Sequence, residues 1–268
     1  MMRWARLKLW FGGTVRVRLP FGSWWMAEDD FCSHSILRED FENPEWRFVE
    51  RYLAPGMTVL DIGAHHGFYS LLASVKVGPA GQVVAFEPSP REHEKLLRNL
   101  AVNGYTNVQV EECALADAAG RQELIVVGGI NTGCNSLRRP DVKEPTSSVA
   151  VQVETLDGYL SGHPLPPIDF IKLDAEGAEL AILKGAENLL KRRPRPVIQC
   201  ELEEIRTRPW GYHPRDVMAL LDTMDFRWFQ PQSEGSLRPV EAAANGDRNF
   251  FAVPEERIER LRAQGMLA

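Results

Sequence analysis

The chain has 268 residues, of which 44% are hydrophobic and 25% charged, a composition typical of globular proteins with ample material for a core. The net charge of −6 and the pI near 5.6 argue against nucleic acid or an anionic membrane surface as a partner. The cysteines form no CxxC pair, which suits a reducing compartment and argues against a zinc framework. They are Cys32, Cys113, Cys134 and Cys200.

The N-terminal sequence, MMRWARLKLWFGGTVRVRLP, is interrupted by Arg and Lys and lacks the continuous apolar stretch of a signal peptide. No segment approaches the length needed to span a membrane. We therefore expect a soluble, cytoplasmic protein without integral membrane association. The Trp- and Arg-rich first dozen residues are a candidate contact with a membrane surface.

The first elements differ from the rest of the chain. TVRVRL at 14–19 alternates with period two and predicts a half-buried strand, and residues 20–43 are aromatic and irregular. A capping residue, Asn43, with a proline directly after it opens a helix. We predict an N-terminal extension over 1–45, rich in strand and aromatic residues, followed by one cofactor-binding domain over 46–268.

From residue 57 the chain alternates between strands and helices. The predicted strands are TVLDIG, QVVAFEP, VQVEECAL, IDFIKLD and PVIQCELEE, and ELAILKGAENLLKR is one of the predicted helices. This alternation predicts βαβ units, hence a parallel sheet with helices on both faces. The closing runs FRWFQP and NFFAVP predict an antiparallel edge. Residues 121–155 depart from the pattern and predict extra strands around a polar loop.

The stretch VLDIGAHHGFYS, residues 59–70, predicts a strand, a glycine-bracketed turn and a helix. Ligands in such sheets bind beyond the carboxyl ends of the strands. A dinucleotide fingerprint needs glycines at its first, third and sixth positions, but after Gly63 these positions hold His65 and Phe68. A nicotinamide-dependent dehydrogenase is therefore disfavoured.

An acidic residue, Glu87, follows Gly67 by 87 − 67 = 20 positions, at the end of the second strand. An ionised carboxylate there can accept hydrogen bonds from two ribose hydroxyls. The strand, the turn and the acid together predict a site for an adenosyl group without a pyrophosphate. This combination indicates S-adenosylmethionine.

Three acids, Asp174, Glu176 and Glu179, cluster where IDFIKLD meets its helix, and Glu201 reaches the same edge from the next strand. We expect partial burial to raise the pKa of Asp174 and make it a general base. Glu179 is expected to cap or pack its helix. Several of these acids could hold a divalent metal, but the sequence does not require one and we predict none.

Other polar and aromatic residues are interpreted more cautiously. The loop Asn131–Ser136 and the pair Trp24 and Trp25 are candidates to cover an acceptor, although tryptophans in such an extension more often fill a core. His213 and Asn249 lie near element boundaries and are expected to cap helices or form turns.

Several ordered blocks resemble the FkbM family of S-adenosylmethionine-dependent methyltransferases. These are VLDIGAHHGFYS, VVAFEPSP, NLAVNG, ECALADAAG, NTGCNSL, VETLDGYL and IKLDAEGAELAILKGAENLL. The D-x-E-G-x-E block is more specific than the glycine turn. The resemblance covers roughly residues 50–204, with the closing RNFFAVP, and implies a Rossmann-like class I fold with a mostly parallel, seven-stranded sheet.

The resemblance also implies roles for residues. It places the methionine part of the cofactor at the glycine turn, the ribose at Glu87 and the adenine at the end of the third strand. The implied cofactor contacts are Asp61, Gly63, Ala64, His65, Gly67, Glu87, Pro88, Cys113, Ala114 and Asp174. The candidate catalytic residues, chosen from their place at the ligand edge of the sheet, are Asp174, Glu176 and Glu201, with helix capping as the alternative for Glu176 and surface solvation for Glu201. The family more often has Asn where His65 and His66 stand, which leaves the role of these histidines open.

The activity that the resemblance implies is O-methylation of a hydroxyl on a sugar or secondary metabolite, as in natural product biosynthesis. N-methylation of an amide or amine in a peptide is the alternative, and a non-catalytic S-adenosylmethionine-binding module is a third reading. The acidic cluster speaks against the last, because a pure binding protein would not need it. The expected partner is a small-molecule, glycan or peptide acceptor, and a homodimer is a candidate assembly.

Overall fold

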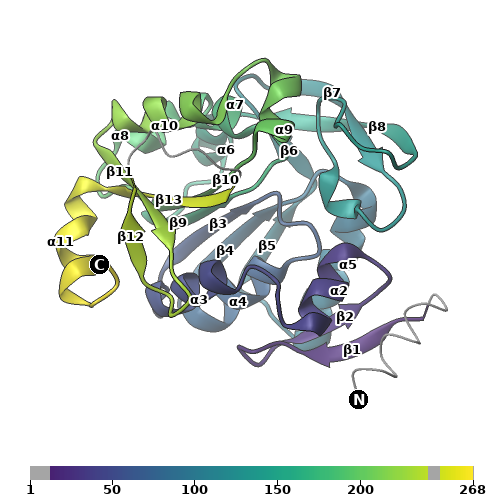
Figure 1. Ribbon diagram of the computed structural model, residues 1–268, viewed down its shortest axis with the longest axis horizontal. Helices are drawn as coiled ribbons and strands as arrows, with labels where there is room; N and C mark the ends of the chain where they lie inside the picture. Colours follow the sequence, from purple (N-terminus) through teal and green to yellow (C-terminus); the bar gives the residue numbers. More distant parts are fainter. Residues whose placement is uncertain (1–12, 241–247, 268) are drawn as a thin grey trace.

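The computed structural model describes residues 13–240 and 248–267 (Figure 1). A central sheet runs through the molecule, with helices on both of its faces. The first dozen residues lie outside the described part, so the membrane contact considered for them stays a prediction. Among the described residues, no helix is both long and apolar enough to cross a bilayer.

The central sheet has the order β12-β11-β13-β10-β9-β3-β4-β5. Its strands are β3 (Thr58–Ile62), β4 (Gln82–Phe86), β5 (Val108–Glu111), β9 (Ile168–Leu173), β10 (Val197–Leu202), β11 (Phe226–Pro231), β12 (Leu237–Pro239) and β13 (Arg248–Pro254). From β10 to β5 all neighbours are parallel, whereas β13 is antiparallel to both β10 and β11. The mostly parallel α/β sheet and its antiparallel edge are confirmed.

The predicted count of seven strands is wrong by one. The eighth strand, β12, has three residues and pairs with β11 at the edge of the sheet. Its sequence, LRP, is too short to show alternation, and its proline is tolerated because the strand lies at an edge.

Helices cover both faces of the sheet. They are α3 (Asn43–Tyr52), α4 (Phe68–Val77), α5 (Pro90–Asn103), α6 (Leu156–Gly162), α7 (Glu179–Lys184), α8 (Glu187–Lys191), α9 (Glu204–Thr207), α10 (Pro214–Asp222) and α11 (Glu255–Ala263). Successive strand residues point to opposite faces, so Val59 packs in the core with α3 and α4, and Leu60 packs in the core with α7 and α10. The closing helix α11 is absent from the sequence prediction.

Two predicted elements are divided. The helix expected over ELAILKGAENLLKR breaks between α7 and α8 at Gly185, where a Cβ would lie 2.3 Å from the carbonyl oxygen of Ala116. The strand expected over VQVEECAL ends as β5, and β6 (Cys113–Leu115) joins a second sheet. That sheet, β6-β8-β7, contains β7 (Gly120–Val127) and β8 (Thr146–Glu154), which confirms the extra strands predicted there.

The N-terminal segment packs directly on the larger domain. The strand β1 (Val15–Arg18) pairs with β2 (Trp24–Ala27), and α2 (Phe31–Arg38) follows, so the interpretation of 20–43 as irregular is wrong. Side chains of α5 take the place of a further strand, because Asn103 and Asn99 accept hydrogen bonds from the backbone of Trp24 and Met26 at 2.6 and 2.8 Å. The domain boundary at residue 45 stays a prediction.

Candidate active site

A cavity of about 420 Å³, here termed the central cavity, lies at the carboxyl ends of β3, β4 and β9. Its volume falls in the range of about 300–1,000 Å³ that is usual for small-molecule sites. The residues predicted for the site that line it are Asp61, Gly63, Ala64, His65, Glu87, Pro88, Cys113, Ala114, Asp174, Glu176 and Glu201. The structure therefore brings together every predicted site residue except Gly67.

The two turn glycines have different reasons to be glycine. Gly63 has φ +79°, and a Cβ there would lie 1.7 Å from the carbonyl oxygen of Asp174, so the turn touches the neighbouring strand end. Gly67 is the N-cap of α4 with φ +88°, and a Cβ there would lie 2.2 Å from Leu96 of α5. Gly63 thus shapes the cavity, whereas Gly67 packs away from it.

The acid at the end of β3, Asp61, is buried and accepts a 2.5 Å hydrogen bond from Ser70 of α4. Burial raises its pKa to about 6, partly offset by the Ser70 hydroxyl and the charge of Lys172. Asp61 therefore ties the strand end to the first turns of α4 on the floor of the cavity.

Glu87 follows β4 and holds the glycine turn. Its two carboxylate oxygens accept hydrogen bonds from the backbone N–H groups of His65, at 2.7 Å, and Ser89, at 2.9 Å. Burial raises the pKa of Glu87 to about 8, against the effect of these two donors. The carboxyl group is therefore fixed at the cavity wall and titrates close to neutral pH.

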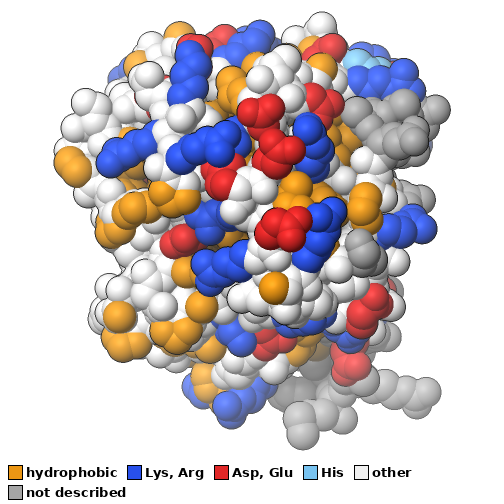
Figure 2. Space-filling model, turned by 90° about the vertical axis from the view of Figure 1, so that its left-hand side faces the viewer, with side chains coloured by type: hydrophobic (Ala, Val, Ile, Leu, Met, Phe, Trp, Pro, Cys, Tyr) orange, Lys and Arg blue, Asp and Glu red, His pale blue; other side chains and the backbone are white. Residues whose placement is uncertain are grey.

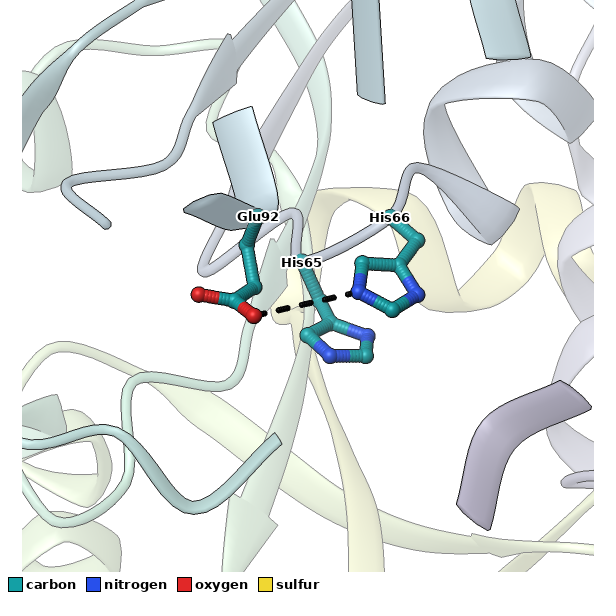
Figure 3. A group of neighbouring side chains, drawn as sticks. All are labelled: His65, His66 and Glu92. Atoms are coloured by element: carbon teal, nitrogen blue, oxygen red, sulfur yellow. Dashed lines mark ion pairs between the residues drawn. The ribbon is translucent and has the colours of Figure 1, made fainter. Parts of the chain in front are cut away.

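His65 and His66 are stacked, with ring centroids 3.6 Å apart, and Glu92 lies beside them (Figure 3). Burial lowers the pKa of His65 well below its usual range, and its Nε2 lies 3.0 Å from the hydroxyl of Thr132. His66 lies 3.8 Å from Asp30 and 3.9 Å from Glu92. These contacts link the turn to the segment before α2 and to α5.

The pKa expected for Asp174 is wrong in direction. Burial is the largest influence and favours the neutral form, but Lys172, with Nζ 2.8 Å from Oδ2, and a hydrogen bond with Glu201 together lower the pKa of Asp174. Residues i and i+2 of a strand point to the same face, which is why β9 brings this pair together. Asp174 is therefore an ionised carboxylate.

The pKa values of Glu176 and Glu201 are shifted in the opposite direction, upward. Burial, followed by the charges of Asp174 and Glu176, raises the pKa of Glu201 well above its usual range. Burial also raises the pKa of Glu176. Nε of Arg206 lies 2.8 Å from Oε2 of Glu176 and forms an ion pair with it, but the two groups are not aligned for a hydrogen bond. Carboxylate oxygens of Asp174, Glu176 and Glu201 lie within 4.8 Å of one another. The predicted lack of a metal stays a prediction.

Glu179 has a structural role, as expected. It is buried at the start of α7 and accepts hydrogen bonds from the backbone N–H groups of Ala175 and Gly177 at 2.9 and 3.2 Å. Burial raises its pKa to about 7. Glu179 therefore holds the turn that carries Glu176, which has φ +52°.

The sequence analysis missed a second polar group in the cavity. Glu42, the N-cap of α3, accepts a 2.5 Å hydrogen bond from Tyr69, which in turn accepts one of 3.1 Å from Gln199. Lys172 Nζ lies 5.1 Å from the centre of the Tyr69 ring. Polar residues inside apolar strands, Lys172 and Gln199, were the available signal, because such residues are buried only with partners.

The elements expected to cover an acceptor have different positions. All residues of the loop Asn131–Ser136 line the central cavity, and the Ser136 hydroxyl donates a 2.8 Å hydrogen bond to the carbonyl of Glu176. Trp25 is fully buried in the core, so it is no open platform. His213 caps α10 as expected, whereas Asn249 lies within β13 and forms no turn.

Comparisons with known proteins show the family of the chain. Residues 61–228 match the methyltransferase FkbM domain family. Methyltransferase sdnD of Sordaria araneosa is 32% identical over 197 residues, which cover 63% of this chain and 73% of that protein. The 2-O-methyltransferase NoeI of Sinorhizobium fredii is 25% identical over 150 residues, covering 52% of this chain and 60% of that protein.

A solved structure of methyltransferase FkbM from Methylobacillus flagellatus KT superposes with a TM-score of 0.46 at 16% identity, covering 85% of this chain and 56% of that one. The α/β sheet with a glycine turn and an acid at the ends of adjacent strands defines a cofactor-binding enzyme fold. The chain belongs to the FkbM family of S-adenosylmethionine-dependent methyltransferases.

Proposed function

We propose that this enzyme methylates a hydroxyl group of a sugar or secondary metabolite, in natural product biosynthesis. The observation that carries the proposal is the ionised carboxylate of Asp174, held by Lys172 at the cavity wall. An alcohol must lose its proton on methylation, and an adjacent carboxylate can accept it. The similarity to NoeI, a 2-O-methyltransferase, supports the same type of acceptor.

The residues of the central cavity suit S-adenosylmethionine. The glycine turn at Gly63 lines the cavity where it lies against the end of β9, and Glu87 presents a carboxyl group at the adjacent strand end. We assign the methionine part to Asp61, Gly63 and Ala64, the ribose to Glu87, and the adenine to Cys113 and Ala114. The bound cofactor supplies an electrophilic methyl group on a sulfonium.

The other two acids act differently from Asp174 in this proposal. Burial and the neighbouring charges raise the pKa of Glu201, so as a neutral acid it can donate a hydrogen bond, whereas Glu176 is held in an ion pair by Arg206. Asp174 then receives the proton of the reacting hydroxyl. Alignment of this hydroxyl with the methyl donor is the main task that the chain itself performs.

N-methylation of a peptide or natural product is the second candidate. The acidic lining of the cavity, with Glu42, Asp174 and Glu201, also suits an amine, because a carboxylate stabilises an ammonium group.

We place the reaction in the cytoplasm, with a small molecule, a glycan or a peptide as partner rather than nucleic acid. On the face in Figure 2, basic and acidic side chains are interspersed, which offers no basic patch there. A homodimer remains part of the proposal.

The test is a screen for acceptors by mass shift. Purified protein with S-adenosylmethionine is incubated with matched sets of hydroxylated glycosides and of amines, and a gain of one methyl group is recorded. Asp174→Asn should lower turnover at least ~100-fold, the usual effect of a general base, while S-adenosylhomocysteine still binds. Asp141→Asn, on a surface ion pair with Arg208, is the control and should keep full turnover. Full turnover of Asp174→Asn would remove it as the base.

A further inference from the structure

A second cavity of about 430 Å³, here termed the outer cavity, adjoins the central one. Both cavities are lined by Glu201 and Glu203, so these two residues form the boundary between them. The outer cavity is mainly polar. Its lining residues are Pro44, Glu45, Glu201, Glu203, Gln230, Pro231, Gln232, Arg238 and Asn249.

The sheet topology places Asn249 next to the reaction site. The antiparallel strand β13 is inserted beside β10, and Asn249 is the direct cross-strand partner of Glu201. Directly opposed residues share one face of a sheet, with Cβ atoms about 5 Å apart. Asn249 Oδ1 is buried and has no hydrogen-bond partner within the part of the chain that the structure describes.

The outer cavity favours ligands that donate hydrogen bonds. An unpaired buried acceptor costs about 1–3 kcal/mol, so a ligand hydroxyl or ammonium group that reaches Asn249 Oδ1 would bind favourably. Glu45, at the start of α3, adds a carboxyl group whose pKa is raised by burial. Arg238, among the lining residues, is directed to the side-chain oxygen of Gln230 at 3.3 Å.

The same lining disfavours anionic ligands. Three glutamates, Glu45, Glu201 and Glu203, surround the space, against the single arginine of the lining. A ligand carboxylate or phosphate there would lose hydration among three glutamate side chains, and the one arginine of the lining is already directed to Gln230. A neutral or cationic ligand with several hydroxyl groups can donate a hydrogen bond to Asn249 and carries no negative charge.

We propose that the outer cavity binds the methyl acceptor, a polyhydroxylated compound without negative charge, and that Asn249 determines its specificity. The reacting hydroxyl then points across Glu201 into the central cavity, toward Asp174. This inference rests on the proposed O-methylation. It assigns acceptor binding to Glu45 and Asn249, which lie outside the residues 61–228 that match the family.

The probes are methyl β-D-glucopyranoside and its glucosaminide and glucuronide counterparts, which are neutral, cationic and anionic. Methyl transfer from labelled S-adenosylmethionine gives KM and kcat for each, and calorimetry gives the affinity for S-adenosylhomocysteine. We expect the neutral and cationic probes to be methylated at least ~10-fold more efficiently than the anionic one. Asn249→Leu should raise KM roughly three- to tenfold, with kcat and S-adenosylhomocysteine affinity retained.

Gln230→Leu, at another lining residue of the outer cavity, is a second variant with the same expected direction, in case Asn249→Leu does not fold. The control is Gln152→Leu, in a separate cavity of about 310 Å³ that residues of β7, β8 and the start of α5 line, which should leave KM unchanged. Preference for the glucuronide, or an unchanged KM in both outer-cavity variants, would overturn the inference. So would S-adenosylhomocysteine binding without methylation of any probe. Loss of S-adenosylhomocysteine binding in the unmodified protein would instead contradict the proposed function.

Discussion

In the proposed function, the cofactor side of the site comes from one continuous stretch, Asp61 to Ala114, whereas the acceptor side collects residues from three separate elements. Glu42 and Glu45 come from the start of α3, Glu201 from β10 and Asn249 from β13. Between Glu45 and Asn249 lie about two hundred residues. Consecutive βαβ units therefore build one half of the site, and the inserted strand β13 completes the other.

This difference determines which structural features each half of the site depends on. The cofactor half depends on backbone geometry at two strand ends, which local residue types and spacing specify. The acceptor half depends on which distant strands become neighbours, and this is a property of the assembled sheet. Changes in the first half should affect S-adenosylhomocysteine binding, whereas changes in the second should affect acceptor kinetics alone.

The largest effect is expected from Gly63→Ala, because its Cβ would collide with the backbone of Asp174. We predict loss of S-adenosylhomocysteine binding and destabilisation by about 3 kcal/mol or more, measured by calorimetry and by denaturant unfolding. Gly104→Ala is the control, since Gly104 also has positive φ but its Cβ would meet nothing within 4 Å. Equal effects in the two variants would show that backbone strain alone, and not the close approach, makes Gly63 necessary.

The next effect is expected from Lys172→Met. Removing the buried ammonium leaves Asp174 without its partner, so burial then raises the pKa of Asp174. In the unmodified protein the lowered pKa contributes stability that is present above pH ~4 and lost as pH falls through the lower folded-state pKa. Without Lys172 we expect a stability loss of about 3 kcal/mol at neutral pH.

The same variant has a kinetic consequence. The acidic limb of the pH–rate profile should move to higher pH by roughly one unit or more, because a larger share of Asp174 is then protonated near pH 7. An acidic limb at the same pH in both proteins would assign that limb to another group. S-adenosylhomocysteine affinity is the internal control, measured on the same preparations.

A smaller effect, on affinity alone, is expected from Glu87→Gln. The pKa of Glu87 is raised to about 8, so its carboxyl group is largely protonated at neutral pH before the cofactor binds. Ribose hydroxyls favour the ionised form, so binding should release a proton below pH 8, and affinity should rise with pH until about 8 and then level off. Glu87→Gln should weaken binding roughly tenfold and remove this pH dependence. A parallel pH dependence in the variant would exclude Glu87 as its source.

The sequence carried enough information for the cofactor half of the site. Alternating strands and helices, the glycines at 63 and 67 and the acid at 87 are local features, and the structure places all but Gly67 on the central cavity. The breaks after β5 and at Gly185 were not predictable, because they follow from contacts with a second sheet and with Ala116.

The acceptor half of the site could not be predicted from local sequence patterns alone. Asp174 was identified from its place at a strand end, but its pKa depends on its distance from Lys172 and Glu201, which only the assembled sheet fixes. Asn249 was expected to cap a helix or form a turn because it lies near a predicted element boundary. The position of Asn249 beside the site follows from its pairing with Glu201, and this pairing depends on the order of the strands in the sheet.

The most direct test of the central claim is a calorimetric titration of the purified protein with S-adenosylhomocysteine, with NAD as the control ligand. The cavity at the ends of β3 and β4 predicts micromolar binding of S-adenosylhomocysteine, release of a proton at pH 7, and no binding of NAD. Binding of NAD instead, or no binding of S-adenosylhomocysteine, would contradict the assignment of the glycine turn and of Glu87.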